Sequence, residues 1–273
     1  WYSPQMATVV VVGDVDPVSI EKKIKEMFAS IPRKKVKGYR VYPLTYEKGI
    51  ALHEIGDDLK RSSELELMIP HPCVVGNTVG TIYRKELGSL LVRAITNRLQ
   101  ARQIRSNVSD AWFLSDKNHF VFTFSGTDKS GLLQQVSDLS NELECILKNG
   151  FTPEELDDAI KELSRTLKVD CSAQLSGKWC DDFVDYVISG DRYIQSEEEM
   201  RQLLEKVQST DSATLQKLLQ EWLSYKEQAL LVAYRNNTGK QNSIQKEDIL
   251  RAWEKGMRSP LKEFVYVPKE VKE

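Results

Sequence analysis

The order of strand-like and helix-like segments constrains the fold of this chain most. Residues 49–55 and 62–69 have the composition of strands and follow each other with no helix between them. Residues 109–114 and 120–124 form a second such pair around a turn at residues 116–118. Strands joined without a helix favour antiparallel hairpins, whereas a doubly wound parallel sheet needs a crossover helix after each strand. We therefore predict an α+β fold rather than a doubly wound one.

Amphipathic helices account for most of the remaining sequence. The longest is expected over residues 79–103, where apolar residues recur at helical spacing. Asn149-Gly150 is expected to end a helix over residues 131–148, and Thr152 and Glu155 form a capping box at the next helix start. Further helices are predicted at residues 173–188, 196–207, 211–223 and 245–257, and a last buried strand at residues 229–234.

The fold class that follows is a layered, antiparallel-rich sheet with helices on one face. Ferredoxin-like split βαβ elements satisfy this order of segments. Pro70 and Pro72 are expected to end the second strand, since proline cannot donate a hydrogen bond to a neighbouring strand.

The first 32 residues form a separate strand–turn–helix unit in this interpretation. Residues 7–12 run Ala-Thr-Val-Val-Val-Val without alternation, which is typical of a strand buried on both faces. Asp16 is the expected N-cap of the following helix, with Pro17 in its first turn. Four of the five residues at 33–37 are basic, which we interpret as a solvated linker between two domains.

Composition excludes two classes of function. The 273 residues include 40 acidic and 38 basic ones, a formal charge of −2, whereas nucleic-acid binders normally show a basic excess. The apolar run Val9–Val12 is far shorter than the ~20 residues of a membrane-spanning helix. No signal peptide is visible, and the sequence begins with Trp1 rather than methionine, so we expect a processed chain or an excised part of one.

Cysteines and histidines are too few and too scattered to form a recognisable site. No Cys-x-x-C pair exists among the four cysteines; two disulfides are conceivable, but buried free thiols are the expectation for a chain of this length. His53, His71 and His119 match none of the zinc-binding helix motifs, although three scattered histidines can in principle converge in space. The four cysteines are Cys73, Cys145, Cys171 and Cys180.

Other catalytic patterns are missing as well. The sequence contains no Gly-x-Ser-x-Gly elbow and no phosphate-binding glycine spacing, and its acidic pairs fit helix first turns better than an acid–base site. Trp112-Phe113-Leu114, in the first strand of the second pair, has two interpretations. Core packing against the long helix is one, and an edge strand that receives an extended peptide is the other.

Two sets of residues resemble the pitrilysin/insulinase family of zinc metallopeptidases. The segment from Trp1 to Pro17, W-Y-S-P-Q-M-A-T-V-V-V-V-G-D-V-D-P, is similar to the W-Y-x-P-x-x-M-x-x-V-V-V-G-D-x-D-P stretch that ends the family's zinc-carrying domain. Residues that resemble the domain after it are Gly150 to Leu156 (G-F-T-P-E-E-L), Asn97-Arg98-Leu99, Trp112-Phe113-Leu114, Phe183 to Tyr186 and Trp222-Leu223.

The resemblance implies that the zinc site lies elsewhere. The family's H-x-x-E-H helix and its third glutamate ligand precede the W-Y-x-P segment, so no metal ligand and no catalytic residue is assigned here. A family arginine and tyrosine that assist substrate binding have no convincing counterpart around residues 107–114. No cofactor is expected in this chain, and zinc is expected in the full-length parent.

The domain organisation follows from the same resemblance, which implies a mitochondrial-processing-peptidase-like metalloprotease domain. Residues 1–32 would be the last strand and helix of the preceding zinc domain, and residues 33–47 a linker. Residues 48–238 would form the second, non-catalytic domain, and residues 239–273 a connecting helix and tail.

The implied function is that of a substrate-chamber wall in a zinc-dependent metalloendopeptidase, inactive in this chain alone. Trp112, Phe113 and Leu114 are the candidate substrate-binding residues. The expected partners are the remaining parent domains and a peptide or unfolded polypeptide, and the expected compartment is the periplasm or cell envelope. A catalytically inactive family member that acts as a scaffold or assembly partner is the alternative, and an unrelated α+β interaction module is a third reading.

Overall fold

The computed structural model describes most of the chain. The described residues are 4–32, 49–57, 62–74, 76, 78–112, 117–172, 176–190, 194, 196–236, 244–261 and 264–268. The predicted linker at residues 33–47, and with it the boundary between the two predicted domains, lies outside these ranges, as do Phe113 and Leu114.

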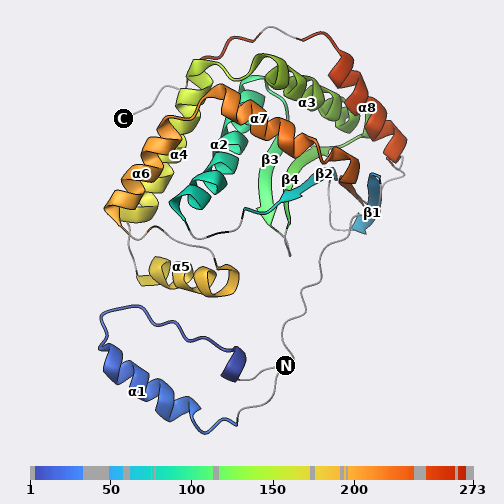
Figure 1. The fold of residues 1–273 in the computed structure, drawn as a ribbon. Helices are drawn as coiled ribbons and strands as arrows, with labels where there is room; N and C mark the ends of the chain where they lie inside the picture. The colour runs from blue at the N-terminus through green and yellow to red at the C-terminus, as the bar shows by residue number, and fades with distance from the viewer. Residues whose placement is uncertain are drawn as a thin grey trace.

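Five strands form one sheet in the order β1-β5-β2-β4-β3, and only β1 and β5 run parallel (Figure 1). The predicted antiparallel-rich α+β sheet is therefore confirmed. The first two predicted strands, β1 and β2, do not form a hairpin, because β5 lies between them. The uninterrupted apolar residues at the start of β5 suit a central strand. The strands are β1 (Ala51–Asp57), β2 (Ser63–Pro72), β3 (Ser106–Trp112), β4 (Lys117–Gly126) and β5 (Leu230–Asn236).

Strand β2 is longer than its sequence predicts, because it continues through both of its prolines. Pro70 pairs with His119 of β4 and Pro72 with Lys117. The pairing of β2 with β5 ends at Met68, so beyond that residue one side of β2 has no ladder partner in the described structure. Beyond Met68 no hydrogen bond to β5 is needed, so the missing N–H groups of Pro70 and Pro72 cost none on that side of β2. The strand can therefore include both prolines.

Helices cover one face of the sheet, as predicted. Leu65, Leu67 and Ile69 of β2 point towards them and are buried, whereas Glu64 and Glu66 on the opposite face are half-buried. The core lies between this face and the helix layer, and its largest fully buried apolar side chains include three phenylalanines of β4. The covering helices are α2 (Val79–Ala101), α3 (Lys129–Asn149), α4 (Pro153–Ser172), α6 (Glu197–Gln208), α7 (Ser212–Leu223) and α8 (Lys246–Arg258).

The predicted helix ends are confirmed at two places. Asp16 caps α1 (Pro17–Phe28) by accepting a 3.0 Å hydrogen bond from the Ser19 amide. At the start of α4, the Thr152 amide donates to Glu155 over 2.8 Å and the Glu155 amide donates to the Thr152 hydroxyl over 3.3 Å. These paired bonds are the capping box that the sequence predicts.

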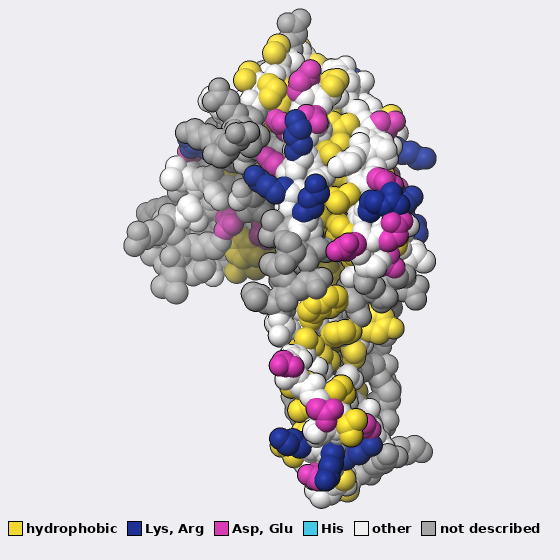
Figure 2. Space-filling view, turned by 90° about the vertical axis from the view of Figure 1, so that its left-hand side faces the viewer, with side chains coloured by type: hydrophobic (Ala, Val, Ile, Leu, Met, Phe, Trp, Pro, Cys, Tyr) yellow, Lys and Arg dark blue, Asp and Glu magenta, His cyan; other side chains and the backbone are white. Residues whose placement is uncertain are grey.

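The predicted strand at residues 7–12 is absent, and this part of the prediction is wrong for the chain as it stands. Only the 3-10 turn η1 (Pro4–Met6) and α1 are regular in residues 4–32, and neither element contains a buried residue. A strand needs a neighbour to satisfy its backbone groups, and no described strand lies beside Val9 to Val12. This part lies apart from the sheet, beyond α5 (Ser176–Ser189), and Figure 2 shows hydrophobic side chains on its surface.

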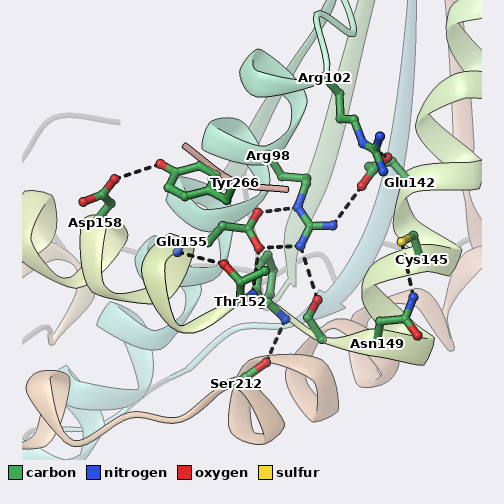
Figure 3. Close-up of polar contacts among 12 residues, drawn as sticks. Arg98, Arg102, Glu142, Cys145, Asn149, Thr152, Glu155, Asp158, Ser212 and Tyr266 are labelled. Atoms are coloured by element: carbon green, nitrogen blue, oxygen red, sulfur yellow. Dashed lines mark hydrogen bonds and ion pairs between the residues drawn. The ribbon is translucent and has the colours of Figure 1, made fainter. Parts of the chain in front are cut away.

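A buried ionic cluster joins α2, α3 and α4 (Figure 3). The Arg98 guanidinium donates to Glu142 over 2.9 Å and to both carboxylate oxygens of Glu155. Phe264, in the segment after α8, covers it, with its ring centroid 4.1 Å from the Arg98 Cζ. Tyr266 of the same segment donates to Asp158 of α4 over 3.0 Å. The chain after α8 is thus held against the helix layer by aromatic and polar contacts.

Candidate functional site

The candidate site lies at the β3 edge of the sheet. Strand β3 pairs with β4 on one side and ends the strand order, so its other side has no strand partner among the described residues. Trp112, at the end of β3, is 55% exposed, so its side chain is not packed in the core. Phe113 and Leu114 complete the predicted triplet but lie outside the described residues.

A cavity of about 600 Å³ opens beside this end of β3. It lies between the strand ends, the first half of α2 and the last turns of α5. Asp110 and Trp112 of β3 both line it, because alternate residues of a strand point to the same face. Its lining comprises His71, Cys73, Val74, Arg84, Lys85, Gly88, Ser89, Asp110, Trp112, Asn118, Asp185, Ile188 and Trp222.

A hydrogen-bonded network forms the polar wall of the cavity. The Nε2 atom of His71 lies 3.0 Å from one carboxylate oxygen of Asp110, and Asn118 donates to the other oxygen over 3.0 Å. The thiol of Cys73 donates to the Asn118 amide oxygen over 2.8 Å. An ionised carboxylate only accepts, so Nε2 of His71 is the donor in the first contact. The network fixes the position of Asp110 at the cavity wall.

Aromatic stacking supports this network from the core side. The rings of His71 and Trp222 stack with centroids 4.1 Å apart, and Phe120 meets Trp222 edge-on at 5.0 Å. Gly88 of α2 makes the arrangement possible, since a Cβ atom there would lie 3.1 Å from the Trp222 ring and 3.5 Å from an Asp110 oxygen. The absence of a side chain at residue 88 therefore lets the Trp222 ring lie close against α2.

Two of the three histidines lie on neighbouring strands, and the described residues around them do not make a metal site. His71 and His119 lie on neighbouring strands, and burial, followed by the nearby His71, lowers the pKa of His119. His53 lies exposed on β1 at the opposite side of the sheet. Within the described ranges no group of three or more histidine, cysteine, aspartate or glutamate residues could hold a metal ion. We therefore derive no chemistry through zinc for these residues.

The cysteines are free thiols where the structure describes them. Cys145 is buried, as the sequence predicts for most of them, whereas Cys73 and Cys180 are half-buried. Cys171 lies in α4, and its side chain is outside the described part.

Sequence reasoning missed the polar members of the site. Asp110, Asn118 and His71 are not singled out by any motif, because their contacts join residues that are 8 and 39 positions apart. One signal was available: alternation along β3 places Asp110 on the same face as Trp112. Trp222 was noted only for its resemblance to the family and not as the floor of a cavity.

Comparison with known proteins places the chain in a family. Residues 1–163, more than half of the chain, match the sequence model described as the peptidase M16 inactive domain. The chain belongs to this M16 family. The resemblance to insulinase-type zinc peptidases that the sequence indicated is thereby confirmed, and so is the expected role of a non-catalytic peptidase-family domain.

Relatives of this M16 domain include a bacterial zinc protease. The probable zinc protease PqqL of Escherichia coli (strain K12) is 27% identical over 165 residues, which cover 58% of this chain and 18% of PqqL. The matched part of the chain thus spans less than a fifth of the length of that relative.

Solved structures show the same fold. The periplasmic protease PqqL of Escherichia coli superimposes with a TM-score of 0.78 at 20% identity, over 95% of this chain and 30% of that chain. A predicted insulinase family protease from Yersinia pestis gives a TM-score of 0.73 at 16% identity, over 90% of this chain and 54% of that chain. None of the helices that the structure describes in this M16 domain is long and apolar enough to cross a bilayer.

Proposed function

We propose that this chain is the non-catalytic wall of a peptide-binding chamber in a longer zinc-dependent metalloendopeptidase. The observation that carries the proposal is the match of residues 1–163 to the peptidase M16 inactive domain. The likeness to a solved chain of PqqL supports it, since this chain covers only 30% of that chain. The remaining domains of the parent are then the first partners of this one.

The parent, not this chain, would supply the zinc chemistry. A zinc ion bound by protein side chains activates water as a nucleophile for peptide-bond hydrolysis. We place the zinc site upstream of Trp1, and we assign residues 1–32 to the end of that zinc domain and residues 48–238 to the non-catalytic domain. Residues 239–273 would be the connecting helix and tail.

Two measurements test this assignment. The complete reading frame is expected to encode an H-x-x-E-H motif before the W-Y-S-P segment. Elemental analysis of this chain after chelator treatment is expected to find no stoichiometric zinc, whereas the intact parent is expected to hold one zinc per chain. One tightly held zinc in this chain, or an upstream sequence without any zinc domain, would contradict the proposal.

The β3 edge is the proposed place where the substrate lies. An extended peptide adds to an exposed sheet edge through main-chain hydrogen bonds, and side-chain contacts then give specificity. Trp112 ends this strand, and Phe113 and Leu114 are the next two residues of the sequence. The place of β3 at the end of the described strand order and the exposure of Trp112 support the proposal.

A matched pair of edge variants tests the peptide site in the intact parent. Phe113→Asp is expected to weaken peptide binding while leaving the zinc content unchanged. Ile55→Asp is the control, because Ile55 is 45% exposed on β1, the opposite edge strand. Thermal unfolding of both variants separates lost binding from lost folding. Equal peptide affinity in the two folded variants would remove the β3 edge from the site.

A scaffold or assembly role is the second candidate, and one comparison favours it. A chain of complex III2 from Candida albicans has the same fold, with a TM-score of 0.61 at 12% identity over 89% of this chain. An upstream H-x-x-E-H motif with its ligands replaced would favour this role over peptide hydrolysis.

The periplasm is the proposed compartment. The support is that the similar solved protease PqqL is described as periplasmic. Fractionation of cells that express the full reading frame tests the location, and recovery of the protein in the cytoplasmic fraction alone would contradict it.

A further inference from the structure

The cavity beside β3 lies where a peptide on that edge would send its side chains. Val108, Asp110 and Trp112 alternate along the strand towards the helix-covered face. A peptide strand added to β3 directs every second side chain over the same face, because side chains of paired strands stay in register. We propose that this cavity is a specificity pocket for a large, neutral aromatic side chain with a polar N–H or O–H, namely tyrosine or tryptophan. This inference rests on the peptide site proposed for the β3 edge.

The apolar walls of the pocket suit an aromatic ring. Trp112 stands at its mouth with 55% of its surface exposed, and Trp222 forms its floor with 5% exposed. Val74 and Ile188 add aliphatic surface, and Ile188 of α5 is 73% exposed. A cavity of about 600 Å³ accommodates an indole or phenol ring. Offset stacking on the Trp112 indole is the contact that distinguishes an aromatic ring from an aliphatic side chain.

Asp110 provides a hydrogen-bond acceptor for the polar end of such a ring. Its two oxygens accept from His71 and Asn118, each over 3.0 Å. A carboxylate has about four lone-pair sites, so it has capacity for another donor. Gly88 has no side chain that could cover Asp110, which lies within 3.5 Å of where a Cβ atom would be. A phenol O–H or an indole N–H can therefore donate to Asp110 from within the pocket.

The charges that line the pocket favour a neutral side chain over a charged one. The lining includes two basic side chains, Arg84 and Lys85, and two acidic ones, Asp110 and Asp185, so its formal charges balance. A lysine or glutamate entering this space would meet like and opposite charges together, so little net attraction would offset the loss of its hydration. Tyrosine and tryptophan keep the stacking and the hydrogen bond without that cost.

Peptides of one extended sequence that differ at a single central residue test the pocket. Tyrosine, tryptophan, phenylalanine, alanine and lysine versions are titrated into the chain by calorimetry. The tyrosine and tryptophan peptides are expected to bind about tenfold more tightly than the alanine peptide. The affinity of the phenylalanine peptide is expected to lie between that of the alanine peptide and those of the tyrosine and tryptophan peptides. The lysine peptide is expected to bind no more tightly than the alanine peptide.

Three variants locate the effect in the pocket. Trp112→Ala is expected to reduce the tenfold ratio between the tyrosine-peptide and alanine-peptide affinities to less than about twofold. Asp110→Asn is expected to abolish the difference between the tyrosine and phenylalanine peptides. Ser89→Phe fills the cavity from the exposed face of α2, so it is expected to lose the aromatic preference without touching the core. Ile55→Ala on β1 is the control and is expected to keep the wild-type preference.

The outcomes separate the pocket from the edge site on which it depends. If all peptides bind with equal affinity, the pocket has no specificity and the inference fails, while the proposed edge site stands. If the lysine peptide binds most tightly, the proposed preference of the pocket for a neutral aromatic side chain is wrong. If no peptide binds to the folded chain, the edge site and the pocket both fail. A tenfold preference that survives Ser89→Phe and Trp112→Ala, with both variants folded by thermal unfolding, also overturns the inference.

Discussion

Arg98 is a fully charged side chain buried between three helices. Burial alone would lower its pKa, but the hydrogen bond and charge of Glu155, and then those of Glu142, hold the pKa of Arg98 above its ordinary value. Its guanidinium joins three helices and is covered by Phe264. Glu155 serves twice, because it also accepts the Thr152 amide in the capping box. A single carboxylate thus links a local helix start to the packing of distant elements.

Removing the charge of Arg98 should be costly. Arg98→Met keeps much of the side-chain volume but leaves Glu155 buried without its cation and Glu142 with Arg102 alone. Breaking a buried ion pair by removing one partner typically destabilises by ~3–5 kcal/mol. Urea unfolding at neutral pH measures the loss, with Arg201→Met as the control, since the ion pairs of Arg201 are exposed on α6. A variant as stable as the control would mean that the cluster contributes little.

His119 should make stability depend on pH. Burial, and then the charge of His71, lower the pKa of His119 from its ordinary value of 6.5. The unfolded chain therefore takes up a proton at a higher pH than the folded chain, so stability falls as the pH drops below 6.5 towards the folded pKa. His119→Gln is expected to show a smaller loss of unfolding free energy between about pH 7.5 and about pH 5.5 than the wild type. His53→Gln, at an exposed site on β1, should retain the wild-type change.

Helices α3 and α8 pack so closely that the contact between them requires a glycine on α8. Gly256 of α8 lies against Ser137 and Ser140 of α3, where an added Cβ atom would overlap the Ser140 hydroxyl and the Ser137 carbonyl oxygen. Asn141 donates to the Gly256 carbonyl over 3.0 Å and Ser140 donates to the Trp253 carbonyl over 2.9 Å. The small residues and these hydrogen bonds fix the position of α8 across α3.

Gly256→Ala tests this contact. Helix propensity alone would make alanine more stable by ~1 kcal/mol, whereas overpacking costs ~1–3 kcal/mol or more. Because the clash is with backbone as well as with a side chain, we expect net destabilisation, measured as a lower urea midpoint. Gly177→Ala is the control: it lies in α5 with open space around it and should be neutral or slightly stabilising. Equal effects of the two substitutions would contradict the proposed close packing.

The helices and strands could be predicted from patterns of neighbouring residues. The pairing of strands that lie far apart in the sequence could not. Asp16, Thr152 and Glu155 act within four residues of themselves, so their caps could be predicted from the sequence. The insertion of β5 between β1 and β2 depends on contacts across more than 160 residues, such as Glu66 with Val232, and no local pattern encodes them. Asp110 escaped notice for the same reason, since its partner His71 comes from another strand.

At the scale of the whole molecule, residues 4–32 contribute nothing to the core. Neither η1 nor α1 has a buried residue, and the core cluster draws all its members from residue 65 onwards. Deletion of residues 1–32 is therefore expected to leave the melting temperature within about 2 °C of the original, which corresponds to less than ~1 kcal/mol for a domain of this size. Differential scanning calorimetry measures the shift.

Deletion of residues 246–273 provides a comparison with the deletion of residues 1–32. It removes Ile249 and Ala252 from the core and should lower the melting temperature by far more than the first deletion does. A large drop after removal of residues 1–32 would show that this part is integrated into the domain.

The valine run in residues 9–12 has a consequence for how this chain behaves in concentrated solution. Val9 and Val11 are 49% and 46% exposed, and no described strand occupies the backbone beside them. Short, uncharged, β-branched segments of this kind pair with identical segments of other molecules and seed aggregation. Light scattering of the chain should rise with protein concentration and time, and Val11→Lys should suppress the rise without changing the fold.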